Sequence, residues 1–207
     1  KRVGEFKMSQ FWQCWPSILS KEDCTKLINI AKTYDAKDAV VGGESKAAKL
    51  KVDQEIRRSI VRWLPKNDSR LTELVSLIRN CFEESNARAF GFDLNTFYEL
   101  QFTEYHATDN QHYAWHTDCD MVNCKDVTTR KLSMVIQLSD PSEYEGGMFE
   151  LGAPAVDKDH NAPVKQDLFT PQGSLLVFPS FIYHRVTPVT KGTRYSLVSW
   201  CRGPEFK

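Results

Sequence analysis

The stretch GSLLVFPSFIYHRVTPVTKGTRYSLVSW, residues 173–200, decides the fold class, because it contains three strand-like segments in succession. Each segment is rich in β-branched and aromatic residues, and Gly and Pro residues separate the segments, which is the pattern of short strands joined by turns. Two polar side chains interrupt this apolar texture: His184 follows the first segment, and Arg194 opens the last. The stretch predicts a β-rich fold in which both side chains need a partner.

Segments of the same strand-like composition begin after Gly91. Further strands are predicted at residues 97–106, 131–140 and 146–152. Before Gly91, apolar residues at helical spacing predict helices over residues 17–34 and 68–90. Ser20 is the expected N-cap of the first helix, and Asp68 or Ser69 that of the second. An alternating segment just before Pro65, IRRSIVRW, predicts one strand between the two helices.

Helices followed by a run of short strands predict an α+β fold, mainly β, with a sandwich or jelly-roll barrel in its second half. We expect a single domain over residues 1–207, with a helical support region over residues 1–90 and a jelly-roll core over residues 91–203. Residues 37–54 are polar and rich in Gly and Lys, which indicates either a lid or a simple surface connection. Residues 153–167 are expected to form a polar hairpin extension.

The composition is that of a soluble globular protein, with 41% hydrophobic and 26% charged residues. Lys and Arg together number 27, as do Asp and Glu, so no net charge favours nucleic acid or an anionic membrane. No apolar run approaches the roughly 20 residues that span a bilayer, and we expect no signal peptide. The six cysteines form no CxxC pair, which favours reduced thiols and a cytoplasmic location, in a host cell if the protein is phage-encoded.

A metal site is the first hypothesis for HYAWHTDCD, residues 112–120. If this segment is extended, His116 and Asp118 lie on one face, while Trp115 and Thr117 lie on the other. An imidazole and a carboxylate are borderline ligands that suit Fe(II), Mn(II) or Zn(II). A solvated turn is the alternative, so the hypothesis depends on a third ligand elsewhere.

His184 is the best candidate for that ligand, because it follows a core strand and a buried imidazole requires a partner. A backbone carbonyl is the alternative partner. Arg194 lies ten positions later (194 − 184), with Ser196 on the same face of its strand. A guanidinium beside a hydroxyl suits one end of a dicarboxylate, which it can hold through two parallel hydrogen bonds.

His116-x-Asp118, His184 and Arg194-x-Ser196 together resemble the signature of Fe(II)- and 2-oxoglutarate-dependent dioxygenases. The flanking text QFTEYHATDNQHYAWHTD, RKLSMVIQLSDPSEYEGGMFEL and residues 173–200 are similar to the prolyl 4-hydroxylase-like branch, especially to bacterial and phage PKHD-type hydroxylases. The resemblance covers about Ile56 to Trp200. It implies a double-stranded β-helix with the metal at its mouth.

The resemblance also implies roles for individual residues. His116, Asp118 and His184 would bind and activate the iron. Arg194 would hold the distal carboxylate of 2-oxoglutarate, assisted by Ser196 and by Tyr105. The implied cofactors are Fe(II), 2-oxoglutarate and O2, and ascorbate is compatible with this chemistry. The implied reaction is hydroxylation of a C–H bond with release of succinate and CO2.

The resemblance favours a protein or peptide substrate, and in particular a peptidyl proline. Tyr113, Trp115, Arg62 and Trp63 are the candidates for a substrate wall, and a core position is the alternative for Trp63. A free amino acid or another small molecule is the alternative substrate. A zinc-dependent hydrolase and a metal-free jelly-roll binding module also stay open, as does a zinc site formed by His112, Cys119 and Cys124.

Overall fold

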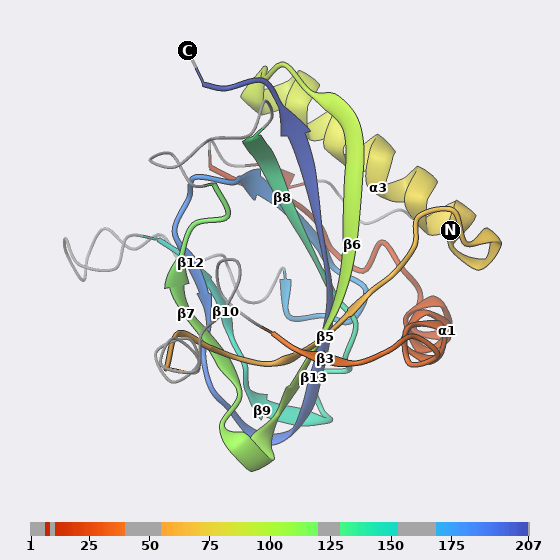
Figure 1. Cartoon of the computed structure of the whole chain (residues 1–207), viewed down its shortest axis with the longest axis vertical. Helices are drawn as coiled ribbons and strands as arrows, with labels where there is room; N and C mark the ends of the chain where they lie inside the picture. Colours follow the sequence, from red (N-terminus) through yellow and green to blue (C-terminus); the bar gives the residue numbers. More distant parts are fainter. Residues whose placement is uncertain (1–6, 9–10, 40–54, 120–128, 153–168, 207) are drawn as a thin grey trace.

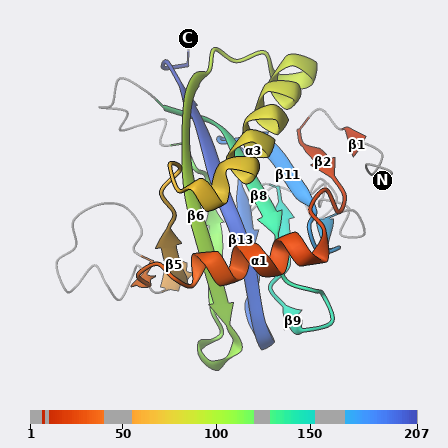
Figure 2. The ribbon, with the colours of Figure 1, turned by 90° about the vertical axis from the view of Figure 1, so that its right-hand side faces the viewer.

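The computed structural model describes residues 7–8, 11–39, 55–119, 129–152 and 169–206. Within these residues a large β-sheet is covered on one face by two helices, and a small sheet lies across its other face (Figure 1). Viewed from the side, both helices lie in front of the large sheet (Figure 2). The mainly β fold with supporting helices is as the sequence predicts.

The large sheet has nine strands in the described part of the chain, in the order β1-β2-β11-β8-β13-β6-β5-β3, with β9 paired to β13. Their bounds are β1 Lys7–Met8, β2 Gln13–Trp15, β3 Lys37–Asp38, β5 Ile60–Trp63, β6 Asn95–His106, β8 Thr129–Gln137, β9 Tyr144–Gly146, β11 Leu175–Pro179 and β13 Val189–Gly203. The small sheet has the order β10-β12-β7-β4. Its strands are β4 Arg57–Arg58, β7 His112–His116, β10 Phe149–Leu151 and β12 His184–Val186.

The β13 strand decides which side chains reach the space between the sheets. It pairs with β6 on one side and with β8 on the other, and all three strands are buried over most of their length. Because side chains alternate along a strand, Leu197 and Cys201 pack toward the helices, whereas Arg194 and Trp200 line a cavity on the opposite face. The strand thus separates an apolar core from a polar cavity.

The helices form where the sequence predicts them. The α1 helix, Lys21–Ala31, begins with a capping box in which Ser20 and Asp23 satisfy each other's backbone N–H groups. A 3₁₀ turn, η1 Ser69–Leu71, leads into α3, Thr72–Ser85. The N-cap of η1 is Asp68, whose carboxylate accepts a hydrogen bond from the backbone N–H of Arg70. A π-helical turn, η2 Asn86–Phe90, then ends at Gly91 in the left-handed conformation.

The segment predicted as a strand between the two helices forms β4 and β5, and the first 90 residues also contribute β1, β2 and β3, which the sequence did not predict. The β2 strand pairs with β11, β5 pairs with β6, and β4 pairs with β7, so the first 90 residues complete both sheets. The physical reason is that an edge strand of a sheet exposes unpaired N–H and C=O groups, which another segment of the chain can satisfy. The possible lid and the polar extension lie mostly outside the described residues, apart from β3 and Ala39.

Five of the six cysteines lie in the described residues, and none of these five forms a disulfide. Burial raises the pKa of Cys14, Cys24 and Cys81 to about 12, so these thiols stay protonated and unreactive. No helix of the described residues is both long and apolar enough to cross a membrane.

Candidate metal centre and co-substrate pocket

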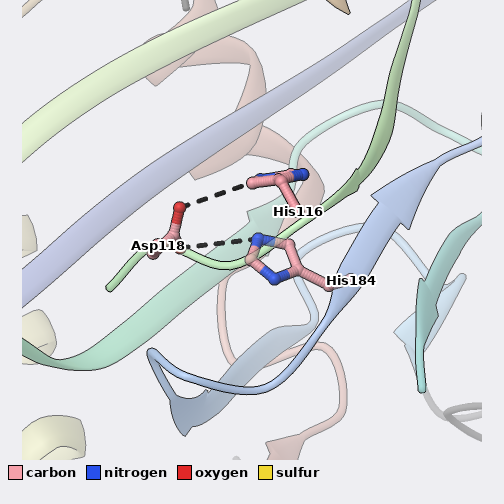
Figure 3. Close-up of side chains that lie close together, drawn as sticks. All are labelled: His116, Asp118 and His184. Atoms are coloured by element: carbon pink, nitrogen blue, oxygen red, sulfur yellow. Dashed lines mark ion pairs between the residues drawn. The ribbon is translucent and has the colours of Figure 1, made fainter. Parts of the chain in front are cut away.

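His116, Asp118 and His184 meet on the inner side of the small sheet (Figure 3). His116 ends β7, Asp118 follows it, and His184 begins β12 directly opposite His116 in the strand pairing. Asp118 Oδ1 lies 3.8 Å from His116 Nε2, and Asp118 Oδ2 lies 3.4 Å from His184 Nε2. One potential ligand atom from each residue lies within 4.8 Å of the other two, which is the spacing of ligands around a single ion.

Backbone carbonyls orient both imidazole rings. His116 Nδ1 lies 2.8 Å from the carbonyl oxygen of Ala114, and His184 Nδ1 lies 3.0 Å from that of Ile182. Because a carbonyl only accepts hydrogen bonds, Nδ1 carries the proton in each neutral ring. Each Nε2 therefore presents its lone pair toward Asp118, as a metal ligand must.

Two serines hold the carboxylate. Ser133 Oγ donates a 2.7 Å hydrogen bond to Asp118 Oδ2 and lies 2.9 Å from Ser180 Oγ. The backbone N–H of Asp118 donates to the carbonyl oxygen of Ser180. These bonds connect the carboxylate to β8 and to the end of β11, so it does not depend on its own loop for its position.

The protonation states suit a cation. Burial, reinforced by the charge of His184, holds the pKa of His116 well below its usual range. Burial opposes ionisation of Asp118, but the two histidines and the Ser133 hydroxyl outweigh it and keep the pKa of that carboxyl below its usual value. At neutral pH the site consists of a neutral His116 imidazole and a carboxylate, so a metal ion would displace few protons on binding.

No other group of three or more possible ligands occurs among the described residues. Both ring nitrogens of His112 lie 3.0 Å from backbone carbonyls, those of Asn110 and Glu55. The alternative zinc site is therefore not supported by His112, and Cys124 lies outside the described residues. His106 is paired with Glu104 and Thr193 and lies away from the cluster.

A cavity of about 260 Å³ adjoins the cluster between the two sheets. Its wall is formed by Arg57, Trp63, Gln101, Tyr105, Tyr113, His116, Asp118, Arg130, Val135, Phe149, His184, Val186, Arg194, Ser196, Val198 and Trp200. The sequence-predicted residues Tyr105, Ser196 and Arg194 are thus brought into the same cavity as the three potential ligands.

Arg194 is buried to 99% and is the largest fully buried side chain of the described residues. Its guanidinium lies 5.8 Å from the ring centre of Tyr105, and neither terminal nitrogen has a hydrogen-bond partner in the described part of the protein. Gly147, with a φ of +59°, makes room for it, since a Cβ there would lie 2.9 Å from Arg194 Cδ. A buried guanidinium without partners is costly unless a ligand supplies the acceptors.

Of the four residues expected at a substrate wall, Tyr113 and Trp63 line the cavity, whereas Trp115 and Arg62 do not. Tyr113 lines the cavity and stacks on His116 with ring centres 3.4 Å apart. Strict alternation would put Tyr113 and Trp115 on the same face, but β7 has a register shift between the pairs His116–His184 and Tyr113–Val186. Tyr113 therefore shares the cavity with His116, whereas Trp115 does not line it and lies against Arg185. Arg62 is likewise on the wrong face of β5, where it pairs with Glu104 at 2.9 Å.

Sequence reasoning missed Ser133, Arg57, Arg130 and Trp200. The available signal was alternation: Trp200 is an even number of positions from Arg194 on one strand, and Ser133 is a lone hydroxyl in the apolar segment LSMVI. Arg57 and Arg130 carried no such signal, because an arginine near a strand end is usually solvated.

Replacing Ser133 with alanine is expected to weaken metal binding about tenfold, since losing a hydrogen-bond partner of a ligand typically costs 10–100-fold in affinity. Metal affinity measured by competition with a chromophoric chelator would check this. Ser199→Ala is the matched control, because Ser199 is also a buried strand serine, on β13, and its hydroxyl has no partner among the described residues. Equal affinities for the two variants would contradict the prediction.

Comparisons with known proteins agree with this geometry. A family model described as the 2OG-Fe(II) oxygenase superfamily matches residues 100–202, which include all three potential ligands and Arg194. A PKHD-type hydroxylase of Crocosphaera subtropica is 25% identical over 184 residues, covering 89% of this chain and 75% of the relative.

Two solved structures share the fold. A Pseudomonas putida prolyl-4-hydroxylase has a TM-score of 0.66 at 19% identity, covering 93% of this chain and 92% of that one. A prolyl hydroxylase from Trichoplax adhaerens, solved with a hypoxia inducible factor peptide fragment, has a TM-score of 0.64 at 15% identity, covering 93% and 84%. The architecture of two facing sheets is therefore that of prolyl hydroxylases.

Proposed function

The chain belongs to the 2OG-Fe(II) oxygenase superfamily, and we propose that it hydroxylates a peptidyl proline at the cavity lined by His116, Asp118 and His184. The overall reaction would convert a substrate C–H bond, 2-oxoglutarate and O2 into the hydroxylated product, succinate and CO2. Fe(II), when bound, supplies the activation of O2. The residues of this chain supply the ligands, the grip on 2-oxoglutarate and the walls.

One observation carries the proposal: a two-histidine, one-carboxylate cluster and a buried guanidinium with two unpaired terminal nitrogens share a single cavity. Two histidines and one carboxylate, with open positions, form the ligand set typical of non-haem Fe(II) oxygenases. An unpaired buried guanidinium fits the carboxylate of a dicarboxylic acid, which offers two acceptors in its plane. The residues present therefore fit both iron and 2-oxoglutarate.

We assign the distal carboxylate of 2-oxoglutarate to Arg194. Ser196 lies two residues further along the same face of β13, and its hydroxyl would supply one more donor. Tyr105 faces Arg194 directly across the β6–β13 pairing and is buried, so its ring fixes the guanidinium and its phenol group borders the cavity. Apolar side chains complete the wall and exclude water, namely Val135, Phe149, Val186 and Val198.

Two of the alternatives account less well for the cavity. A zinc hydrolase would use the same three ligands but would leave the buried guanidinium of Arg194 without a role. A metal-free binding module would leave Asp118 and two histidines buried together without a cation. Hydroxylation of a free amino acid uses the same residues, so only the substrate distinguishes it.

Proline as the substrate is supported by two observations. Relatives and structural neighbours carry the names of PKHD-type and prolyl hydroxylases, and one neighbour is described in complex with a peptide. The cavity also presents Tyr113, Trp63 and Trp200, whose rings suit an apolar pyrrolidine.

The test loads the protein with Fe(II) under anaerobic conditions, adds 2-oxoglutarate and a panel of proline-containing peptides, and then admits O2. We expect succinate release that a subset of peptides stimulates, and a gain of one oxygen in those peptides by mass spectrometry. Peptides with proline replaced by alanine are the matched control. Stimulation by free amino acids alone would reject the peptide substrate and leave the iron chemistry intact, whereas no succinate under any condition would reject the proposed function.

A further inference from the structure

A strip of cationic and aromatic side chains lines the cavity beside the metal cluster. We define this strip as Arg57, Trp63, Gln101, Arg130 and Trp200, all of which contribute to the cavity wall. Side-chain contacts and one strand pairing link its members in a continuous series. Arg57 donates a 2.9 Å hydrogen bond to Gln101 Oε1, and Gln101 is the strand-pairing partner of Trp63 across β6 and β5. The ring centres of Trp63 and Trp200 are 6.1 Å apart, and the Arg130 guanidinium lies 3.9 Å from the Trp200 ring centre.

The strip adjoins the metal cluster and is separated from the 2-oxoglutarate end of the cavity. Trp200 is six positions from Arg194 on β13 (200 − 194), which corresponds to about 20 Å at the rise of a strand. Trp200 pairs in register with Ser133, whose hydroxyl binds Asp118. The Arg57 guanidinium lies 4.5 Å from the ring centre of Tyr113, which stacks on His116. A molecule bound to the strip would therefore lie beside the metal cluster and away from Arg194.

Arg57 leaves a positive charge in the cavity that no described residue neutralises. Its contacts are the hydroxyl of Ser59, the amide of Gln101 and the ring of Tyr113, none of which is a carboxylate. Asp118, the one carboxylate that the described residues contribute to the cavity wall, belongs to the metal cluster. Arg130 differs, because it pairs with Glu99 at 2.7 Å.

Two buried donors of the strip also lack acceptors. Trp200 is buried to 95%, and its Nε1 has no hydrogen-bond partner among the residues the structure describes. The same holds for Nε of Arg130. Buried N–H groups are nearly always paired in proteins, so these two indicate a ligand with acceptor oxygens.

We propose that the strip binds the substrate of the hydroxylation and that Arg57 pairs with a carboxylate of the substrate close to the carbon that is oxidised. This inference rests on the proposed function. The carboxylate has two sources, an acidic side chain beside the target residue of a peptide or the α-carboxylate of a free amino acid. Arg130 and Trp200 would donate to neutral oxygens such as peptide carbonyls, because Glu99 already balances the charge of Arg130.

The test measures equilibrium binding without turnover. Protein loaded with Zn(II) and 2-oxoglutarate is titrated into fluorescent peptides with blocked termini that contain one proline, and anisotropy is recorded. Each peptide exists in a pair with Glu or the isosteric Gln at a position flanking proline. Free L-proline and L-prolinamide, added as competitors, form the corresponding small-molecule pair.

The protein variants are Arg57→Gln, Arg57→Lys and the matched control Arg58→Gln, which changes the exposed neighbour on the same strand. We expect the parent and Arg58→Gln to bind the Glu peptide with at least about tenfold higher affinity than the Gln peptide. In Arg57→Gln the preference should fall below twofold with little change for the Gln peptide, and Arg57→Lys should restore part of it. A preference for L-proline over L-prolinamide with the same dependence on Arg57 would identify the free amino acid as the source.

Three results would overturn the inference. The parent could bind both probes of every pair with equal affinity, the preference for the carboxylate probe could survive in Arg57→Gln, or Arg57→Gln could lower the affinity for both probes of a pair equally. Stabilisation of the same samples by 2-oxoglutarate is measured in parallel by thermal unfolding. If 2-oxoglutarate stabilises the protein but no carboxylate preference exists, the inference fails and the proposed function stands. If 2-oxoglutarate has no effect on the parent, the proposed function itself fails.

Discussion

Asp118→Ala is expected to lower Fe(II) affinity by more than about 100-fold and to abolish succinate formation. The variant removes the only anionic ligand of the cluster, and loss of the partners of a ligand alone typically costs 10–100-fold. Two imidazoles would remain, without the carboxylate charge that now faces both of them at 3.8 and 3.4 Å. Metal affinity by chelator competition and succinate release are the two measurements.

Asp109→Ala is the control for Asp118→Ala, because Asp109 is an exposed carboxylate in the turn η3, Ala107–Asp109, just before β7. Near-ultraviolet circular dichroism would verify that both variants keep their tertiary packing. If Asp118→Ala bound Fe(II) within a few-fold of the parent, the assignment of the ligands would be wrong.

Arg194→Met is expected to remove binding of 2-oxoglutarate while leaving the metal site intact. Truncating one partner of a buried charged pair costs about 2–5 kcal/mol, which corresponds to a loss of affinity of roughly 30-fold or more. Methionine fills a similar volume without charge, so the cavity keeps its shape. The KM for 2-oxoglutarate should rise accordingly, and Fe(II) affinity should change little.

Thermal unfolding provides a second readout for Arg194→Met. At 100 times its Kd, 2-oxoglutarate should stabilise the parent by about 2.7 kcal/mol, or roughly 5–10 °C for a chain of this size. This rise should disappear in the variant. Without ligand, the variant should unfold at the same temperature as the parent or higher, because the parent buries a guanidinium with two unpaired nitrogens.

Arg88→Met serves as the control for Arg194→Met, since Arg88 is an exposed arginine paired with Glu84. It should behave like the parent in both measurements. A variant at Arg194 that retained the parent's KM and thermal shift would show that another residue holds the distal carboxylate.

The sequence by itself determined the elements and the polar residues that carry the chemistry. Apolar spacing and the Ser20 cap specify α1, and β-branched and aromatic segments separated by Gly and Pro in residues 173–200 specify β11, β12 and β13. These signals are local, because backbone propensity and side-chain periodicity act over a few residues. The spacing of His116 and Asp118 likewise placed both on one side of their segment.

Only the tertiary structure decided which of these residues share a cavity. Trp115 and Arg62 were expected at the substrate wall, yet the pairing of β7 and β5 turns each of them away from it. The pairing of β4 with β7 brings Arg57 into the cavity, although its segment was expected only to form a strand between the two helices. Strand pairing joins residues far apart in the sequence, so local patterns do not determine it. The hydroxyl of Ser133, 15 residues from Asp118, and the unpaired nitrogens of Arg194 became visible only when that pairing was in place.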